Sequence, residues 1–226
     1  MHIAELWRYP VKSMGGERLA ETPVGVQGIP GDRGIYVVDD RDGILSARTK
    51  PGLLRNRATV DPTGEVLVDG RPWRSPEVGA AVREAAGPGA RLVAADGPER
   101  FDILPLLVLT DGALAAYGHD HRRLRPNVVI GGVSGLAERG WEGRQLAVGE
   151  AVIGLADLRG RCVMTTFDPD TAEPDLEPFL HVRRAFGGTF ALNAWAGRDG
   201  RIAVGDEVRL LDEHEALAVP ERGRYG

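Results

Sequence analysis

Cysteine is scarce in this sequence, occurring once in 226 residues, as Cys162. A single thiol excludes an intrachain disulfide framework and is compatible with a reducing compartment. It also excludes a ferredoxin-type cysteine cluster and a CxxCH haem-attachment motif. We therefore expect that any redox chemistry of this protein draws its electrons from a separate donor.

Long apolar runs and an excess of positive charge are also missing. The sequence has no stretch of about 18 apolar residues, so no membrane span is expected. Its first residues lack the basic and apolar regions of a signal peptide. The formal net charge of −5 argues against a general nucleic-acid-binding protein. These absences predict a cytoplasmic globular protein without membrane or nucleic-acid partners.

Glycine and proline, by contrast, are abundant, with 31 and 15 occurrences. They separate short segments of alternating or β-branched residues, a pattern typical of strands joined by tight turns. Asp42-Gly43 predicts a hairpin turn. Ser75 predicts a helix start, since it can cap the first turn and Pro76 suits the first helical position. Strands are expected at residues 2–9, 35–39, 44–47, 58–60, 65–68, 91–95, 106–109, 127–130 and 186–194.

These elements predict a mostly β fold with some helix (α+β). Up to about Trp73 the short antiparallel strands indicate a small barrel. The polar loop at residues 96–100 is the predicted domain boundary. It would divide the chain into domains of residues 1–97 and 98–226.

The single cysteine lies in the stretch Arg159-Gly160-Arg161-Cys162-Val163-Met164-Thr165-Thr166-Phe167-Asp168. A thiolate is a strong nucleophile and a soft metal ligand. Neighbouring guanidinium groups favour the thiolate by Coulomb attraction. A lone cysteine, however, is often a small buried apolar residue. The residues of this stretch alone leave both interpretations open.

Several basic residues are expected in loops or at strand ends. They are Lys12, Arg33, Arg48, Lys50, Arg122, Arg123, Arg125, Arg159 and Arg161. Arginine forks bind phosphate in bidentate fashion, so the joint pattern suggests a site for a small anion. Each residue taken singly is more simply a solvated surface charge, because sequence spacing cannot show that the side chains converge.

Two series of motifs resemble a known family. The first series resembles the N-terminal β-barrel domain that accompanies MOSC domains. Its motifs are Leu6-Trp7-Arg8-Tyr9-Pro10-Val11-Lys12-Ser13, Gly31-Asp32-Arg33 and Ser46-Ala47-Arg48. The second series resembles the MOSC domain itself, which is named for the C-terminal domain of molybdenum cofactor sulfurases. Its motifs are Leu124-Arg125-Pro126-Asn127-Val128-Val129, Trp141-Glu142-Gly143-Arg144, Arg161-Cys162-Val163-Met164-Thr165-Thr166 and Val204-Gly205-Asp206. The motifs run through nearly the whole chain in the family's order. The resemblance implies two β-barrel-like domains.

The resemblance also implies the molybdenum cofactor (Mo-molybdopterin), held between the two domains. Cys162 would ligate molybdenum and be the catalytic residue, and Lys12 and Ser13 would hold the phosphate of the pterin. Further cofactor contacts are implied for Arg33, Arg48, Thr110, Arg125, Asn127 and Arg161. Pyridoxal phosphate binding is implied only as a family-level association.

The amidoxime-reducing branch of the family implies an oxidoreductase. Its small-molecule substrates would be N-hydroxylated or N-oxide compounds, and a partner reductase would supply the electrons. Relatives often have Phe-Gly-x-Tyr in the last strand, whereas this chain has Phe186-Gly187-Gly188-Thr189, so the tyrosine contact to the cofactor is absent. The alternatives are sulfur transfer through a Cys162 persulfide, a non-catalytic cofactor carrier, and a scaffold whose catalysis is unrelated to molybdenum.

Two further groups of polar residues have simpler explanations. His119, Asp120 and His121 have awkward spacing for a metal site and are expected to form a polar loop. Asp168 and Asp170 flank a proline, which is common turn chemistry, rather than a pair of catalytic carboxylates.

Overall fold

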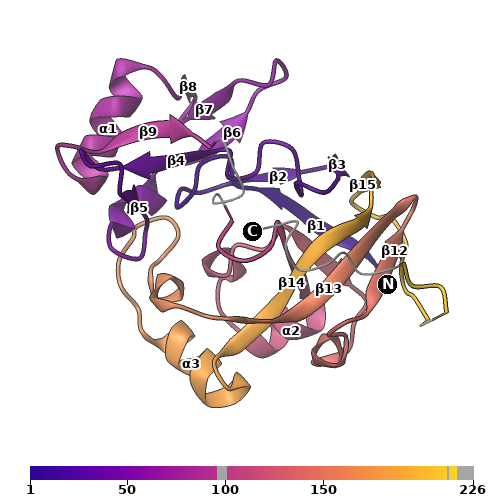
Figure 1. The fold of residues 1–226 in the computed structure, drawn as a ribbon. Helices are drawn as coiled ribbons and strands as arrows, with labels where there is room; N and C mark the ends of the chain where they lie inside the picture. Colours follow the sequence, from indigo (N-terminus) through magenta and orange to yellow (C-terminus); the bar gives the residue numbers. More distant parts are fainter. Residues whose placement is uncertain (96–100, 213, 218–226) are drawn as a thin grey trace.

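The computed structural model describes residues 1–95, 101–212 and 214–217 of the chain (Figure 1). Strands predominate, because the described residues form sixteen strands and three α-helices. The predicted mostly β fold is confirmed. No helix within these described residues combines the length and apolar character that a membrane crossing requires.

An eight-stranded sheet forms the lower part of the molecule in Figure 1. Its order is β16-β12-β13-β14-β10-β11-β1-β2, and neighbouring strands are antiparallel except for the parallel pair β10 and β11. The strands are β1 (His2–Arg8), β2 (Glu17–Leu19), β10 (Leu106–Thr110), β11 (Val128–Gly131), β12 (Gln145–Val148), β13 (Ala151–Gly160), β14 (Thr189–Arg198) and β16 (Val208–Leu210). The first two strands of the chain therefore complete a sheet whose other strands all follow residue 105.

A second pairing also joins the two ends of the chain. Strand β3 (Glu21–Val24) pairs antiparallel with β15 (Gly200–Ala203). The first 24 residues thus share backbone hydrogen bonds with strands from the second half of the sequence. The predicted boundary between residues 97 and 98 lies outside the described residues.

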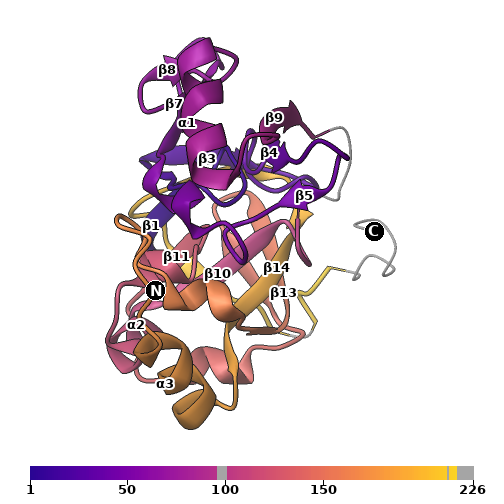
Figure 2. The same cartoon turned by 90° about the vertical axis from the view of Figure 1, so that its left-hand side faces the viewer.

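A smaller unit lies above the large sheet in Figures 1 and 2. It contains the sheet β5-β4-β9 and the sheet β6-β7-β8, with helix α1 beside them. These elements are β4 (Ile35–Val38), β5 (Ile44–Leu45), β6 (Ala58–Val60), β7 (Val66–Val68), β8 (Arg71–Pro72), α1 (Pro76–Ala86) and β9 (Arg91–Ala94). Both local predictions for this region are confirmed. Asp42 adopts the positive φ of 63° in the β4–β5 hairpin, and the Ser75 hydroxyl accepts a hydrogen bond from the backbone of Val78 in α1.

Two helices lie at the opposite end of the molecule, α2 (Asp111–Tyr117) and α3 (Glu177–Phe186). Aromatic rings join them to the large sheet, with ring centroids 5.4 Å apart for Tyr117 and Phe190 and 4.8 Å apart for Phe186 and Phe190. The strand predicted from residue 186 begins instead at Thr189. The reason is that α3 extends to Phe186, and Gly187 then ends it in the left-handed conformation.

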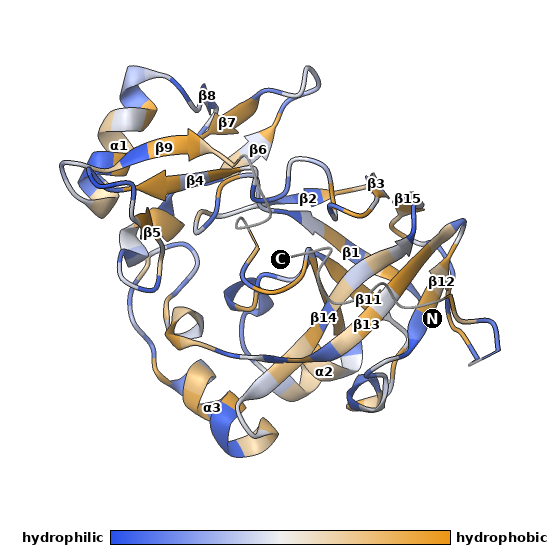
Figure 3. Ribbon diagram, in the orientation of Figure 1, coloured by the Kyte–Doolittle hydropathy of each residue, from blue (hydrophilic) through white to orange (hydrophobic). Residues whose placement is uncertain are grey.

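Apolar residues gather in three clusters, and Figure 3 shows that the strands are mostly apolar while many connecting loops are polar. One cluster, with Leu6 and Val108, belongs to the large sheet. The second, with Met14 and Val82, lies under α1, and the third surrounds Tyr117. The basic residues expected to form a site lie outside these clusters, near strand ends. Their charged groups there need not pack against apolar neighbours.

The first turn of α2 provides a test of the packing between that helix and the loop after β11. A methyl group added at Gly112 would collide with the backbone carbonyl oxygens of Val133 and Gly135, which cannot swing away as a side chain could. We expect Gly112→Ala to lower the free energy of unfolding by about 1–3 kcal/mol. Gly140→Ala is the matched control, since open space surrounds that position. Urea denaturation measures both, and equal stability of the two variants would contradict the close packing.

Candidate functional site

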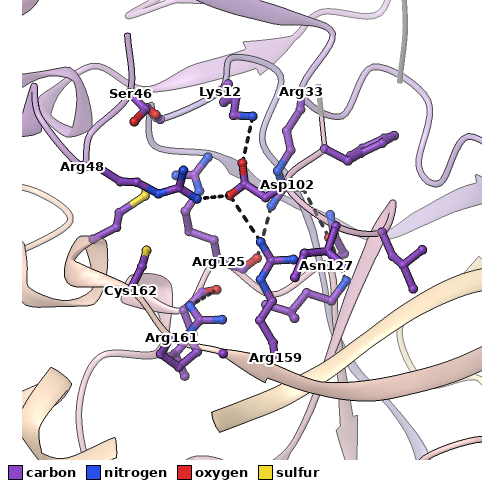
Figure 4. Close-up of a pocket in the computed structure, with 18 of the residues that line it drawn as sticks. Lys12, Arg33, Ser46, Arg48, Asp102, Arg125, Asn127, Arg159, Arg161 and Cys162 are labelled. Carbon is purple, nitrogen blue, oxygen red and sulfur yellow. Dashed lines mark hydrogen bonds and ion pairs between the residues drawn. The ribbon is translucent and has the colours of Figure 1, made fainter. Parts of the chain in front are cut away.

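A cavity of about 290 Å³ lies between the large sheet and the smaller unit (Figure 4). We call it the cationic cavity. Its wall includes the predicted site residues Lys12, Ser13, Arg33, Arg48, Arg125, Asn127, Arg161 and Cys162. All lie within five residues of a strand end, after β1, β5 and β13 and before β4 and β11. The structure therefore brings together loops that are far apart in the sequence.

Thr110 and Thr189, two positions that the sequence analysis related to the cofactor, lie outside the cationic cavity. Thr110 is fully buried at the start of α2, where its hydroxyl accepts a hydrogen bond from Ala113 N at 3.0 Å and donates one to Glu138 at 3.1 Å. It caps the helix and is not among the residues that line the cationic cavity. Thr189 contacts the side chain of Arg139 and does not line the cavity either.

Three residues of the cavity wall have an unusual backbone. Ser13, Arg33 and Arg125 adopt positive φ values of 72°, 51° and 57°. This conformation costs an L-residue on the order of 1–2 kcal/mol. The Ser13 hydroxyl also accepts a hydrogen bond from Ala47 N at 2.9 Å, which holds the loop that carries Arg48. Strain of this kind is concentrated where side chains must be aimed at a common point.

A buried carboxylate that the sequence analysis did not single out holds these loops in place. Asp32 is fully buried and accepts hydrogen bonds from Tyr9 N at 2.7 Å and from the Asn127 amide at 3.2 Å. It also forms an ion pair with Arg33. Asn127 in turn accepts a hydrogen bond from Leu107 N at 3.2 Å. Asp32 belongs to the Gly-Asp-Arg motif, so the motif itself was the signal that could have identified it.

Two guanidinium groups in the wall are buried without a carboxylate partner among the described residues. Arg125 stacks over the ring of Tyr9 at 4.1 Å and donates to the carbonyl of Met14, but its Nη2 has no hydrogen-bond partner. Arg161 donates to the carbonyl of Leu124 at 2.9 Å, and its Nε has no partner. Burial lowers the pKa of each guanidinium to about 10, so both remain charged at neutral pH.

The centre of the cavity holds a second acid that the sequence analysis missed (Figure 4). The Asp102 carboxylate lies 2.9 Å from Lys12 Nζ, 2.8 Å from Arg48 Nη2 and 3.3 Å from Arg159 Nη2. Burial by itself would raise the pKa of Asp102, but these cations outweigh that effect and hold the pKa below its usual value. Asp102 lies in a loop with no motif of its own, so nothing in the sequence pointed to it.

Cys162 is half-buried at the end of β13, and its sulfur points towards the same cluster of side chains (Figure 4). Arg48 lies beside Cys162 in the cavity wall and forms an ion pair with Asp102. Both neighbours raise the pKa of Arg48. A guanidinium group therefore lies beside the single thiol.

The other polar groups are engaged in local structure. His121 Nε2 lies 3.0 Å from a carboxylate oxygen of Glu5, and Asp120 forms an ion pair with Arg122. Asp168 accepts hydrogen bonds from the backbone of Asp170 and Thr171. The expected turn after Asp168 is confirmed, whereas the segment expected to be a polar loop ends at Asp120, which caps the short 3-10 helix η3 (His121–Arg123).

Curated proteins similar to this chain include the mitochondrial amidoxime-reducing components. The human component 1 is 24% identical, with 93% of this chain and 83% of that protein aligned. The mouse component 1 is 23% identical, with 93% and 82% aligned. Component 2 from human is 29% identical over 38% of this chain and 27% of that protein.

Among solved structures, the YUAD protein from Bacillus subtilis is similar in fold. The two chains superpose with a TM-score of 0.51 at 14% sequence identity, covering 92% of this chain and 93% of that one. At this identity the likeness concerns the fold alone.

Two family profiles match successive parts of the chain. The profile of the MOSC N-terminal beta barrel domain matches residues 1–90, and the profile of the MOSC domain matches residues 113–209. The residues that line the cationic cavity come from both matched regions and from the segment between them. The chain therefore belongs to the MOSC-domain proteins, with a MOSC N-terminal beta barrel domain preceding the MOSC domain.

Proposed function

We propose that this protein binds the molybdenum cofactor in the cationic cavity and is an oxidoreductase for N-hydroxylated or N-oxide small molecules. MOSC domains are associated with molybdenum cofactor binding, and the similarity to amidoxime-reducing components supports a role of this kind. The observation that carries the proposal is the pair of buried guanidinium groups, Arg125 and Arg161, beside the single thiol of Cys162.

The residues of the cavity fit such a cofactor. A buried cation without a counterion is costly, and both arginines have a buried nitrogen without a hydrogen-bond partner. An anionic group with several acceptor oxygens, such as the phosphate of the pterin, would satisfy these donors. A thiolate is a suitable ligand for a soft metal, and the thiol of Cys162 faces the same space.

Each residue has a defined task in this proposal. Lys12, Arg125 and Arg161 would hold the phosphate and pterin, and Cys162 would ligate molybdenum. Arg48, which lies beside Cys162 in the cavity wall, would place a positive charge next to the ligating sulfur. Asp32 would keep Arg33 and Asn127 in place through its hydrogen bonds.

When bound, the cofactor would supply a metal that can accept an oxygen atom from the substrate and give the substrate two electrons. The chain has one cysteine and so cannot ligate an iron–sulfur cluster with several thiolates. The electrons would therefore come from a separate donor protein.

Sulfur transfer is the second candidate, and the position of Arg48 beside Cys162 in the cavity wall is what favours it. A guanidinium that stabilises a thiolate would equally stabilise the anion of a Cys162 persulfide, without any metal. In that case Cys162 would accept a sulfur atom from a donor persulfide and pass it to an acceptor nucleophile.

Molybdenum content separates the two candidates. We expect the wild-type protein, produced in a host that makes the cofactor, to carry close to one molybdenum atom per chain. Cys162→Ser should lose most of that metal or, if the pterin still binds, reduce a model amidoxime with a chemical reductant at least about 100-fold more slowly. Val163→Ala is the control, since Val163 is exposed and does not line the cavity.

Equal molybdenum and equal activity in the wild type and Cys162→Ser would contradict the ligand role. A wild-type protein without molybdenum whose Cys162 takes up labelled sulfur from a desulfurase would favour sulfur transfer instead.

The central position of Asp102 generates a further prediction. Its carboxylate forms ion pairs with Lys12, Arg48 and Arg159, so it competes with any bound anion for the same cations. We expect Asp102→Asn to bind inorganic phosphate about tenfold more tightly than the wild type, measured by calorimetry. Glu77→Gln, in the first turn of α1, removes the same charge outside the cavity and should leave phosphate binding unchanged. Unchanged or weaker binding by Asp102→Asn would contradict an anion site at these cations.

A further inference from the structure

A second cavity, of about 370 Å³, adjoins the cationic cavity. We call it the Trp7 cavity. The two cavities share three wall residues, Arg123, Arg125 and Met164. Its other residues come from β1 and the loop after it, from η1 (Pro51–Arg55) and the residues that follow, from η3 (His121–Arg123) and from residues 167–170. Of the residues that line only this cavity, Arg122 was among the basic residues that suggested an anion site, and none was implied as a cofactor contact.

One side of the Trp7 cavity is aromatic. The rings of Trp7 and Tyr9 are nearly parallel, with an interplanar angle of 12° and centroids 6.3 Å apart. Both side chains are largely buried, and Phe167 and Met164 complete an apolar wall with them. Flat rings and a thioether provide favourable contacts for another planar ring.

The other side is cationic, with five arginines in the wall. Two of them are already neutralised. Arg122 forms ion pairs with Asp120 and with Asp170, the one acid in the wall, at 2.6 and 2.7 Å. Arg123 lies 3.4 Å from a carboxylate oxygen of Asp168.

The remaining three arginines keep their charge available. Arg55, Arg57 and Arg125 form no ion pair with a carboxylate of the described residues. Arg55 and Arg57 are exposed at the rim, whereas Arg125 is half-buried and its Nη2 atom is fully buried. The Trp7 cavity therefore carries an excess of positive charge next to an apolar surface.

Buried polar atoms without partners point to a missing ligand. Tyr9, of which 2% is exposed, lines this cavity but not the cationic one, and its hydroxyl has no hydrogen-bond partner. The unpaired Nη2 of Arg125 lies in the wall that the two cavities share, so it is assigned above to the cationic cavity, whereas the Tyr9 hydroxyl belongs to this cavity alone. Buried donors are nearly always satisfied in folded proteins, so a group with acceptor oxygens is expected to meet them.

We propose that the Trp7 cavity is a binding site for a small aromatic carboxylate. The ring of the ligand would lie against Trp7 and Phe167, and its carboxylate would face Arg55 and Arg57, which line this cavity alone. Aromatic stacking and guanidinium–carboxylate bonds both act without the molybdenum cofactor, so this site does not depend on the function proposed for the cationic cavity.

The test uses 2-naphthoate as ligand and isothermal titration calorimetry on the whole protein without cofactor. We expect 2-naphthoate to bind, and the uncharged 2-naphthamide to bind at least about tenfold more weakly because it cannot form charge-assisted hydrogen bonds. Acetate, which has the charge but no ring, should give no measurable binding.

The site is located with matched double variants. Arg55→Gln with Arg57→Gln should weaken 2-naphthoate binding about tenfold or more, since it removes two rim cations. Arg71→Gln with Arg83→Gln is the control, because it removes the same charge at exposed positions of the smaller unit that line neither cavity. Lys12→Gln, in the cationic cavity only, should leave 2-naphthoate binding unchanged.

Three outcomes would overturn the proposal. The first is no binding of 2-naphthoate at millimolar concentration, and the second is equal affinity in the two double variants. The third is a loss of affinity in Lys12→Gln equal to that in the Arg55 and Arg57 variant, which would place the ligand in the cationic cavity instead.

Discussion

The buried carboxylate of Asp32 is the interaction on which the arrangement of this molecule depends. It joins the end of β1, through Tyr9 N, to the start of β11, through the amide of Asn127, and it neutralises Arg33 at the entrance to β4. A buried carboxylate is stable only when its oxygens are fully engaged. The three contacts therefore constrain one another, and they hold the large sheet and the smaller unit in a single relative position. The cationic cavity forms at that junction.

Positive charge is the second organising feature, and it is distributed unevenly. The chain carries a net charge of −5, yet the junction collects arginines and a lysine around a few acids. Some of these cations are compensated, as Lys12 and Arg48 are by Asp102. Others, Arg125 and Arg161, are buried without a carboxylate partner among the described residues. Low local polarity strengthens the attraction of such cations for anions. The position of Arg125 in both cavity walls also places the two proposed sites side by side.

Much of the fold was predictable because it follows from local chemistry. Asp42 in the β4–β5 hairpin and Ser75 at the start of α1 act on neighbouring residues, and their effect is visible in a short window of sequence. Of the cofactor contacts that the resemblance to the MOSC family implied, all but Thr110 line the cationic cavity, whereas Asp102 at its centre was not identified. A threonine before a helix is ambiguous, since the same hydroxyl can face a ligand or cap the helix, and here it bonds to Ala113 N.

The amino-acid sequence by itself determined the mostly β character of the protein, its membership of the MOSC family and the presence of one thiol flanked by arginines. The tertiary structure alone decided that β1 pairs with β11, so that Lys12 lies near Arg125 and Cys162. It also decided that Asp102 meets Lys12, Arg48 and Arg159, and that a second cavity opens beside Tyr9. The physical reason is that turn chemistry and strand alternation act over a few residues, whereas the convergence of loops depends on which distant strands form hydrogen bonds.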